Sequence, residues 1–223
     1  MNKVLIHGFF LILLCVGSFY SCKKIVQPPE SELPSSFKNI YINGTAYLNI
    51  SEGTENVVTE ASGYSIKAMI LDSSLIITGW GNVNLKMKEC DTIFVNDNSI
   101  INGLGSTKCK HVTLKIGDVP SLAVNNINLA DSMDVILNGK GTYTFSGITN
   151  KLNVYVNADG SFSGYNLVTK NCKARINSNG NAEVFVSDTL TGIINGDGTI
   201  YYKGNPSFVM PVIISGNGQL IKN

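Results

Sequence analysis

The chain has 223 residues, of which 43% are hydrophobic and only 15% charged, so it can bury a core of domain size and is not a disordered protein. Its 17 basic and 16 acidic residues nearly balance, which argues against a nucleic-acid partner, because phosphate binding needs an excess of positive charge. Frequent Gly and Asn residues favour strands and turns over helices.

The N-terminus has the features of a secretory signal. Lys3 precedes a mostly apolar run, Val4 to Phe19, that is too short and too abruptly closed for a spanning helix. Ser21 and Cys22 end this run, and a small residue before Cys resembles the lipobox of bacterial lipoproteins. The resemblance implies a signal peptide at residues 1–21, cleavage before Cys22 and a lipid anchor on that residue, which would hold the protein on a membrane. An ordinary cleaved signal with an incidental Cys is the alternative.

A tether and one repetitive domain follow. Residues 22–38 are predicted to be a flexible tether, since they are rich in Pro and Ser and show no hydrophobic period. Residues 39–223 consist of short apolar alternations separated by Gly, Asn and Asp. One turn residue per unit recurs about every 19 residues. These turn residues are Gly44, Gly63, Gly81, Asn98, Gly117, Gly141, Gly160, Gly180, Gly198 and Gly218.

The repeat predicts an all-β fold, a parallel β-helix of about ten rungs, because each unit is too small to bury its own apolar face. A β-sandwich is the alternative. The longer step from Gly117 to Gly141 indicates an insertion around residues 120–131. Aligning the units produces an inward apolar column eight residues before each turn residue. Its members are Cys90, Cys109, Met133, Leu152, Cys172, Leu190 and Met210.

The stretch INGDGTIY at residues 194–201 contains two glycines that could form a phosphate-binding loop. It is one of several repeated corners, and these corners share a column of aligned Asn residues. Its Asn195 aligns with Asn138, Asn157 and Asn177, and stacked Asn side chains can pass amide hydrogen bonds along the axis. The glycines of this stretch serve a repeated turn, and no helix follows them to hold a phosphate.

Two outward surfaces are candidate binding regions. Five residues before each turn residue stands a mostly apolar column, in which Ile136, Tyr155, Ile193 and Ile213 form a candidate interface stripe. The same column includes Ile93, Val112 and Arg175. Tyr165, Phe185 and Tyr201 are expected on neighbouring rungs, where their rings could stack on sugars. Isolated surface aromatics without a ligand are the alternative to this binding face.

The chemically reactive residues do not form a catalytic pattern. Cys90 and Cys109 lie on adjacent rungs, so they are either buried core residues or a disulfide in an oxidising compartment. His111 has no placed nucleophile or acid, and the Asp residues of the corners are explained by turn chemistry. No metal site, cofactor or enzyme activity is predicted, because the cysteines lack ligand spacing and the polar column builds no pair of carboxylates.

Residues 39–223 resemble the DUF2807 family, described as a putative autotransporter-adhesin head (GIN) domain. The resemblance rests on the repeated GxG corners, on Gly198, Ile200, Tyr202, Gly204 and Pro206 at alternate positions, and on Ser215-Gly216-Asn217-Gly218. It implies a right-handed, pectin-lyase-like β-helix, export, frequent lipid anchoring, no catalytic set and a role in adhesion.

The sequence therefore predicts an exported, lipid-anchored envelope protein that faces the cell surface or the periplasm and acts as a noncatalytic adhesion or glycan-binding module. A glycan or host-surface ligand is the expected partner, together with the membrane. A structural, self-associating envelope protein is the alternative, and a carbohydrate-active enzyme is a third. Because the last rung has no residues left to cap it, a homo-oligomer that covers this end is expected.

Overall fold

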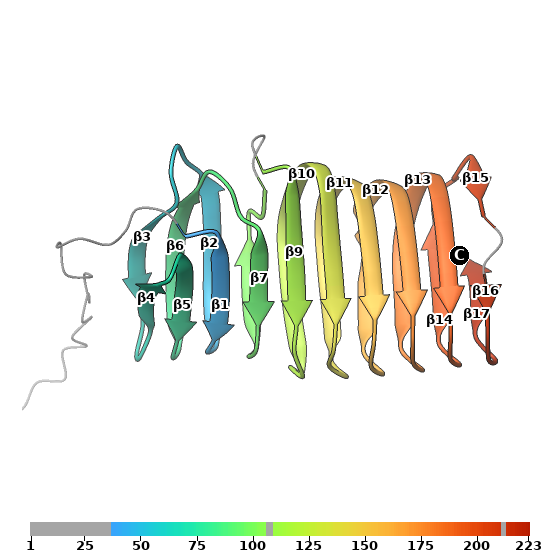
Figure 1. Ribbon diagram of the computed structural model, residues 1–223, viewed down its shortest axis with the longest axis horizontal. Coiled ribbons are helices and arrows are strands. Elements are labelled where there is room, and N and C mark those ends of the chain that lie inside the picture. The colour runs from blue at the N-terminus through green and yellow to red at the C-terminus, as the bar shows by residue number, and fades with distance from the viewer. Residues whose placement is uncertain (1–36, 106–108, 211–212) are drawn as a thin grey trace, which may run out of the picture.

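The computed structural model describes residues 37–105, 109–210 and 213–223. Its described elements are all strands, stacked as a parallel β-solenoid of about six turns (Figure 1). The fold class is confirmed, whereas ten rungs were too many. The predicted signal peptide, most of the tether and the lipid anchor at Cys22 lie outside the described residues. Within the described part of the chain no helix could span a bilayer.

The N-terminal strands are short. They are β1 (Asn39–Asn43), β2 (Ala46–Glu52), β3 (Val57–Ser62), β4 (Lys67–Leu71), β5 (Ser74–Thr78), β6 (Gly81–Met87), β7 (Thr92–Val95), β8 (Ser99–Asn102) and β9 (His111–Ile116). The central and C-terminal strands are β10 (Ser121–Leu137), β11 (Thr142–Val156), β12 (Ser161–Ile176), β13 (Asn181–Ile194), β14 (Thr199–Lys203), β15 (Phe208–Val209), β16 (Ile213–Ile214) and β17 (Gln219–Lys222).

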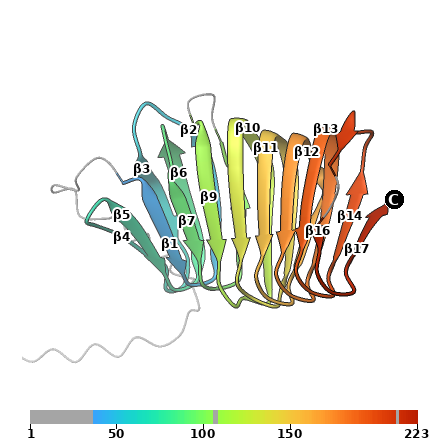
Figure 2. The same cartoon turned by 45° about the vertical axis from the view of Figure 1, so that its right-hand side comes forward.

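The long central strands each pass through three segments of a turn. Strands β10 and β11 pair in parallel, but their register shifts after Val124 and again after Leu129. These shifts divide the central strands into a first segment (121–125 in β10), a second (127–129) and a third (132–137), with equivalents in β11, β12 and β13. Each turn of the solenoid therefore stacks directly on the next, as Figure 2 shows from the side.

The core consists of inward-facing ladders. Leu137, Val156 and Ile176 are register partners on consecutive turns, and none of them has any exposed surface. Phe145 and Phe162 stack with their ring centroids 4.6 Å apart. Alternate residues face outward, which is the period that strands impose on side chains.

The N-terminal turns do not stack in chain order. Strand β1 pairs in parallel with both β5 and β7, and β2 pairs with both β6 and β8, so the first turn lies between two later ones. Strands β3 and β4 pair antiparallel to β6 and β5 and close this end of the solenoid. The segment around Gly63 therefore belongs to this cap and not to a turn of its own, whereas Gly81 begins β6, a parallel strand of the outermost turn.

One turn residue of the sequence alignment was misplaced. Thr142 pairs with Ser121, so Gly141 aligns with Pro120 and not with Gly117. The expected insertion around residues 120–131 is not a separate loop: the segment belongs to β10, where the two register shifts each leave one residue more than in β11. The misplacement also explains why Val112, expected outside, is completely buried. Ile93, placed from Asn98, is completely buried as well, because it pairs with the inward Leu114 while Phe94 holds the outward position. Cys109 likewise leaves the inward column, where Val112 pairs with Met133.

Hydrogen-bonded asparagine ladders run along the solenoid. Asn157 donates to Asn138 at 3.0 Å, Asn177 to Asn157 at 2.8 Å, and Asn195 to Asn177 at 2.9 Å. A second ladder, which the sequence analysis did not anticipate, runs through the first segments. In this ladder the side chain of each residue donates a hydrogen bond to the next, in the order Ser146, Asn125, Asn102, Asn49, Asn84 and Glu60.

Candidate functional site

The candidate interface stripe is an outward column of the third segments. Ile136 pairs with Tyr155, while Ile193 pairs with Ile213, which is 64% exposed. Arg175 stands between these two pairs, and Lys115 precedes Ile136. The stripe is therefore a mixed apolar and cationic column, in which Lys115 joins the expected Arg175.

The column continues toward the N-terminus through aromatic residues. Tyr41 and Phe94 stack with their centroids 4.3 Å apart and their planes 4° from parallel. Nζ of Lys115 lies 5.1 Å from the centroid of Phe94. The Phe94 ring is thus in contact with both Tyr41 and Lys115, which limits its stacking on a ligand.

The candidate binding face at Tyr165, Phe185 and Tyr201 lies in the C-terminal turns. Phe185 pairs with Lys203, whose Nζ lies 4.2 Å from the centroid of the Tyr165 ring. The Tyr165 hydroxyl accepts a hydrogen bond from Asn223 at 2.6 Å, and partial burial raises the pKa of Tyr165. Tyr201 occupies the neighbouring outward column, as the partner of Glu183. The structure thus gathers the three aromatic residues, but one face of Tyr165 is covered.

An exposed apolar ladder adjoins this face and was missed in the sequence. Ile148 pairs with Val168, and Val168 pairs with Phe185, all on the second segments. Ile148 is 61% exposed and Val168 is 41% exposed, beside a shallow depression lined in part by Asn150 and Lys170. The register shift between Gly164 and Val168 hid this column, because it breaks the simple spacing of the repeat.

Two further exposed aromatic residues lie on the N-terminal cap. Tyr64 is 92% exposed and Trp80, the single tryptophan of the chain, is 54% exposed. Their turns are joined, because the backbone nitrogen of Trp80 donates to Oγ of Ser65 at 3.1 Å. Nothing in the repeat pattern distinguished these turns from the others.

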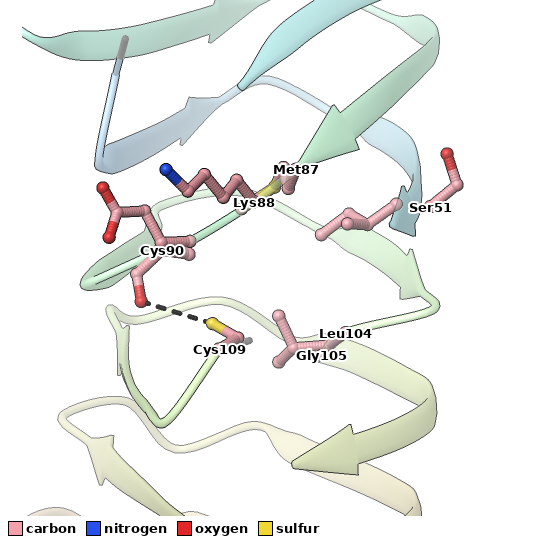
Figure 3. Close-up of a pocket in the computed structure, with 9 residues that line it drawn as sticks. Ser51, Met87, Lys88, Cys90, Leu104, Gly105 and Cys109 are labelled. Carbon is pink, nitrogen blue, oxygen red and sulfur yellow. Dashed lines mark hydrogen bonds between the residues drawn. The ribbon is translucent and has the colours of Figure 1, made fainter. Parts of the chain in front are cut away.

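Cys90 and Cys109 meet at a small pocket between β6 and the segment after β8 (Figure 3). Both thiols are free, and Sγ of Cys109 donates to the backbone oxygen of Cys90 over 3.7 Å. The two residues are neighbours, as expected, without forming the disulfide in this structure. Burial raises the pKa of each thiol, and it raises that of Cys172 to about 12.

His111 sits in a polar group on the third segments. Its ring nitrogens lie 2.8 Å from Oγ of Ser132 and 3.2 Å from Oγ1 of Thr113, and Nε2 is 3.7 Å from Asp134. Asp134 also accepts a hydrogen bond from Asn153 at 2.6 Å. Within the described ranges no three His, Cys, Asp or Glu side chains gather as metal ligands would. The polar contacts of His111 are those of a surface residue held by its neighbours.

The sequence was compared with models of known protein families. Residues 36–206 match the model of DUF2807, the "Putative auto-transporter adhesin, head GIN domain". The chain belongs to this family. No curated protein matches this chain.

Solved structures share the solenoid of this DUF2807 domain. A putative adhesin from Bacteroides fragilis NCTC 9343 is 14% identical with a TM-score of 0.64, over 84% of this chain and 93% of that one. A putative adhesin from Parabacteroides distasonis ATCC 8503 is 20% identical with a TM-score of 0.56, over 85% and 93%. A putative lipid binding protein from the same organism is 16% identical with a TM-score of 0.53, over 85% and 93%. At these identities the likeness concerns the fold alone.

The structure explains one part of the DUF2807 resemblance. Gly204 follows β14 with a φ of +92°, a conformation that side chains other than glycine rarely adopt. A Cβ atom at this position would lie 2.2 Å from the backbone oxygen of Val186. The Gly-x-Pro stretch at residues 204–206 therefore marks a close approach between turns.

Proposed function

We propose that this DUF2807 chain is an exported, lipid-anchored, noncatalytic module that binds glycans or host surfaces. The observation that carries the proposal is the ladder in which the exposed Ile148 and Val168 are followed by the half-buried Phe185, beside Tyr165. Outward positions of a solvated sheet are normally polar, so an exposed apolar column next to aromatic rings is a candidate contact surface. Membership of a family described as adhesins supports the same direction.

The rigidity of the solenoid fits a display role. Several outward side chains are held by neighbours on adjacent turns, as in the asparagine ladders and the Tyr41–Phe94 stack. A surface that is fixed before binding loses little conformational entropy when a ligand is bound. Noncatalytic recognition uses such a surface directly, whereas hydrolysis of a glycoside usually needs a pair of closely placed carboxyl groups.

Binding of the purified mature chain, with Cys22→Ser to prevent lipidation, to a panel of neutral and charged glycans tests the function. The double variant Tyr165→Ala/Phe185→Ala is expected to lose at least about tenfold in affinity, because aromatic anchors dominate such contacts. The control Tyr64→Ala, which removes an exposed ring on the cap, is expected to bind normally. Equal binding by all three proteins would refute this face as the contact surface.

Lipid attachment at Cys22 is a separate part of the proposal. It is supported by the lipobox-like end of the apolar segment and by the Pro-rich tether that follows. Cells grown with labelled palmitate should incorporate the label into the wild-type protein and not into Cys22→Ser. Labelling of both proteins, or of neither, would contradict the anchor.

A structural, self-associating role is favoured by one observation at the C-terminal end. Val209 and Ile214 are 37% and 44% exposed, although their register partners Leu190 and Ile194 are completely buried. Among the described residues β17 pairs only with β14, so one of its edges is open. Analytical ultracentrifugation should detect a dimer that Ile214→Asp disrupts. A monomer at all accessible concentrations would remove this alternative.

A further inference from the structure

A groove of about 330 Å³ crosses three consecutive turns on their third segments. Its lining comes from two adjacent outward columns, whose side chains are in register. The first column contains Lys151, Asn171 and Thr189, and the second contains Asn153, Lys173 and Thr191. Tyr155 forms part of its wall. The groove lies apart from the Ile148–Val168–Phe185 ladder, which belongs to the second segments.

The charge of this groove is not neutralised locally. Lys151 and Lys173 are exposed, and neither forms an ion pair with a described residue. Arg175 adds a third positive charge beside Lys173 on β12, and its Nε donates to the uncharged Oδ1 of Asn177 at 3.0 Å. The carboxylate of Asp134, on the adjacent turn, is bound by other groups: it accepts a hydrogen bond from Asn153 and lies 3.7 Å from Nε2 of His111. Three cations thus cluster in a chain whose net charge is only +1.

The remaining lining groups suit a hydroxyl-rich ligand. No other described residue hydrogen-bonds the side chains of Asn171 and Thr189, so they can meet a ligand with both donors and acceptors. The ammonium groups can donate to carboxylate or sulfate oxygens, and such charge-assisted bonds are stronger than neutral ones. The half-buried ring of Tyr155 offers an apolar edge beside them.

We propose that this groove is a binding site for an anionic saccharide, a chain of sugar rings that carry carboxylate or sulfate groups. Lys151 and Lys173 bind the acidic groups, while Asn171 and Thr189 contact ring hydroxyls. The assignment rests on the glycan-binding function proposed above and names its ligand class. It gives the module a second contact surface, on the third segments of the same turns.

Affinity measurements by calorimetry on the Cys22→Ser mature chain test the site. The probes are oligogalacturonate, which carries carboxylates, dextran sulfate, which carries sulfates, neutral dextran, and poly-glutamate as an acidic peptide. The double variant Lys151→Gln/Lys173→Gln is expected to weaken binding of an anionic saccharide by roughly ten- to hundred-fold, as the loss of two charge-assisted contacts predicts. Binding should also weaken as salt is raised, since the contacts are exposed and therefore screened.

The control variant Lys67→Gln/Lys140→Gln removes the same charge at exposed positions on the cap and on a corner. It should bind like the wild type, and both double variants should keep the wild-type circular dichroism spectrum. Equal weakening by the control, equally tight binding of poly-glutamate, or no binding of either anionic saccharide would overturn the site. Binding of neutral dextran that survives the Lys151/Lys173 change would overturn the site and leave the glycan-binding function standing. If no glycan binds at all, both proposals fail.

Discussion

Nδ2 of Asn177 donates to Oδ1 of Asn157 at 2.8 Å, while Oδ1 of Asn177 accepts from Asn195 at 2.9 Å and from Nε of Arg175 at 3.0 Å. The corner at residues 194–201, whose glycines suggested a phosphate loop at first sight, contributes Asn195 to this ladder. Its polar side chains therefore hold adjacent turns together. The repeat explains the corner without a ligand.

Replacing Asn177 with Ala should destabilise the solenoid. The change removes three side-chain hydrogen bonds, each of which contributes about 0.5–1.5 kcal/mol net. Because these bonds are exposed to solvent, we expect a total loss of about 1–3 kcal/mol. Urea unfolding followed by circular dichroism measures the difference. The control Asn150→Ala, at an exposed position for which no hydrogen bond is seen, should change stability by less than about 0.5 kcal/mol. Equal effects would show that the ladder contributes nothing.

Gly117 interrupts the asparagine ladder that contains Asn138 and Asn177. Replacing this glycine with asparagine should stabilise the protein. The backbone nitrogens of Asn96, Gly117 and Asn138 bond to successive turns in the same way, so Gly117 occupies an asparagine position. A Cβ there would have Oδ1 of Asn96 as its nearest neighbour, at 3.2 Å, and the position has no positive φ. Gly117→Asn should raise the free energy of unfolding by about 1 kcal/mol, from a hydrogen bond and reduced unfolded-state entropy. A lower urea midpoint than wild type would contradict this.

The corrected register separates two isoleucines that the sequence alignment placed in one column. Ile93 is completely buried, whereas Ile193 is a half-buried outward residue. Ile93→Ala should cost about 2–5 kcal/mol because it leaves a cavity, while Ile193→Ala should cost clearly less. Thermal unfolding of both variants measures the difference. A larger loss of stability in Ile193→Ala than in Ile93→Ala would contradict the corrected register.

The repeat predicted the fold because side-chain alternation and turn residues recur along the chain, and parallel stacking turns that recurrence into ladders. The asparagine column at residues 138–195 was correct for this reason. The N-terminal third was not, because β1 lies between β5 and β7, and sequence spacing carries no information about stacking order. Gly117 was marked as a turn residue because it resembles one, although the true equivalent of Gly141 is Pro120.

The candidate surfaces were predicted less well than the fold. Tyr165, Phe185 and Tyr201 do gather, but the contact of Lys203 with Tyr165 depends on the C-terminal turns and could not be inferred from spacing. Ile148 and Val168 were missed because register shifts within β11 and β12 bring them beside Phe185. Lys151 and Lys173 belong to different columns of the repeat, so only the stacked turns show that they line one groove.

The cysteines should be unreactive in the folded protein. Burial raises the pKa of Cys90, Cys109 and Cys172, so the reactive thiolate is scarce at pH 8. A thiol reagent such as Ellman's should label the Cys22→Ser mature chain slowly until urea unfolds it, and then count three thiols. Because the folded state holds these protons more tightly, stability should fall as the pH rises from about 9 toward about 12. Rapid labelling at pH 8 would contradict the buried positions.

The same titration decides the state of the Cys90–Cys109 pair in protein secreted to an oxidising compartment. Three thiols after unfolding mean that the pair is reduced, as in this structure. One thiol without reductant and three with it would mean that the two residues form the disulfide their proximity allows.

Binding of glycans or host surfaces, as proposed above, requires this DUF2807 solenoid to be held outside the cell. Treating intact cells with a membrane-impermeant amine-reactive biotin tests surface display most directly, because outward lysines such as Lys173 are exposed along the solenoid. The protein should be labelled on intact cells, while a periplasmic marker protein is not. Labelling only after the outer membrane has been permeabilised would contradict surface display and favour the structural role inside the envelope.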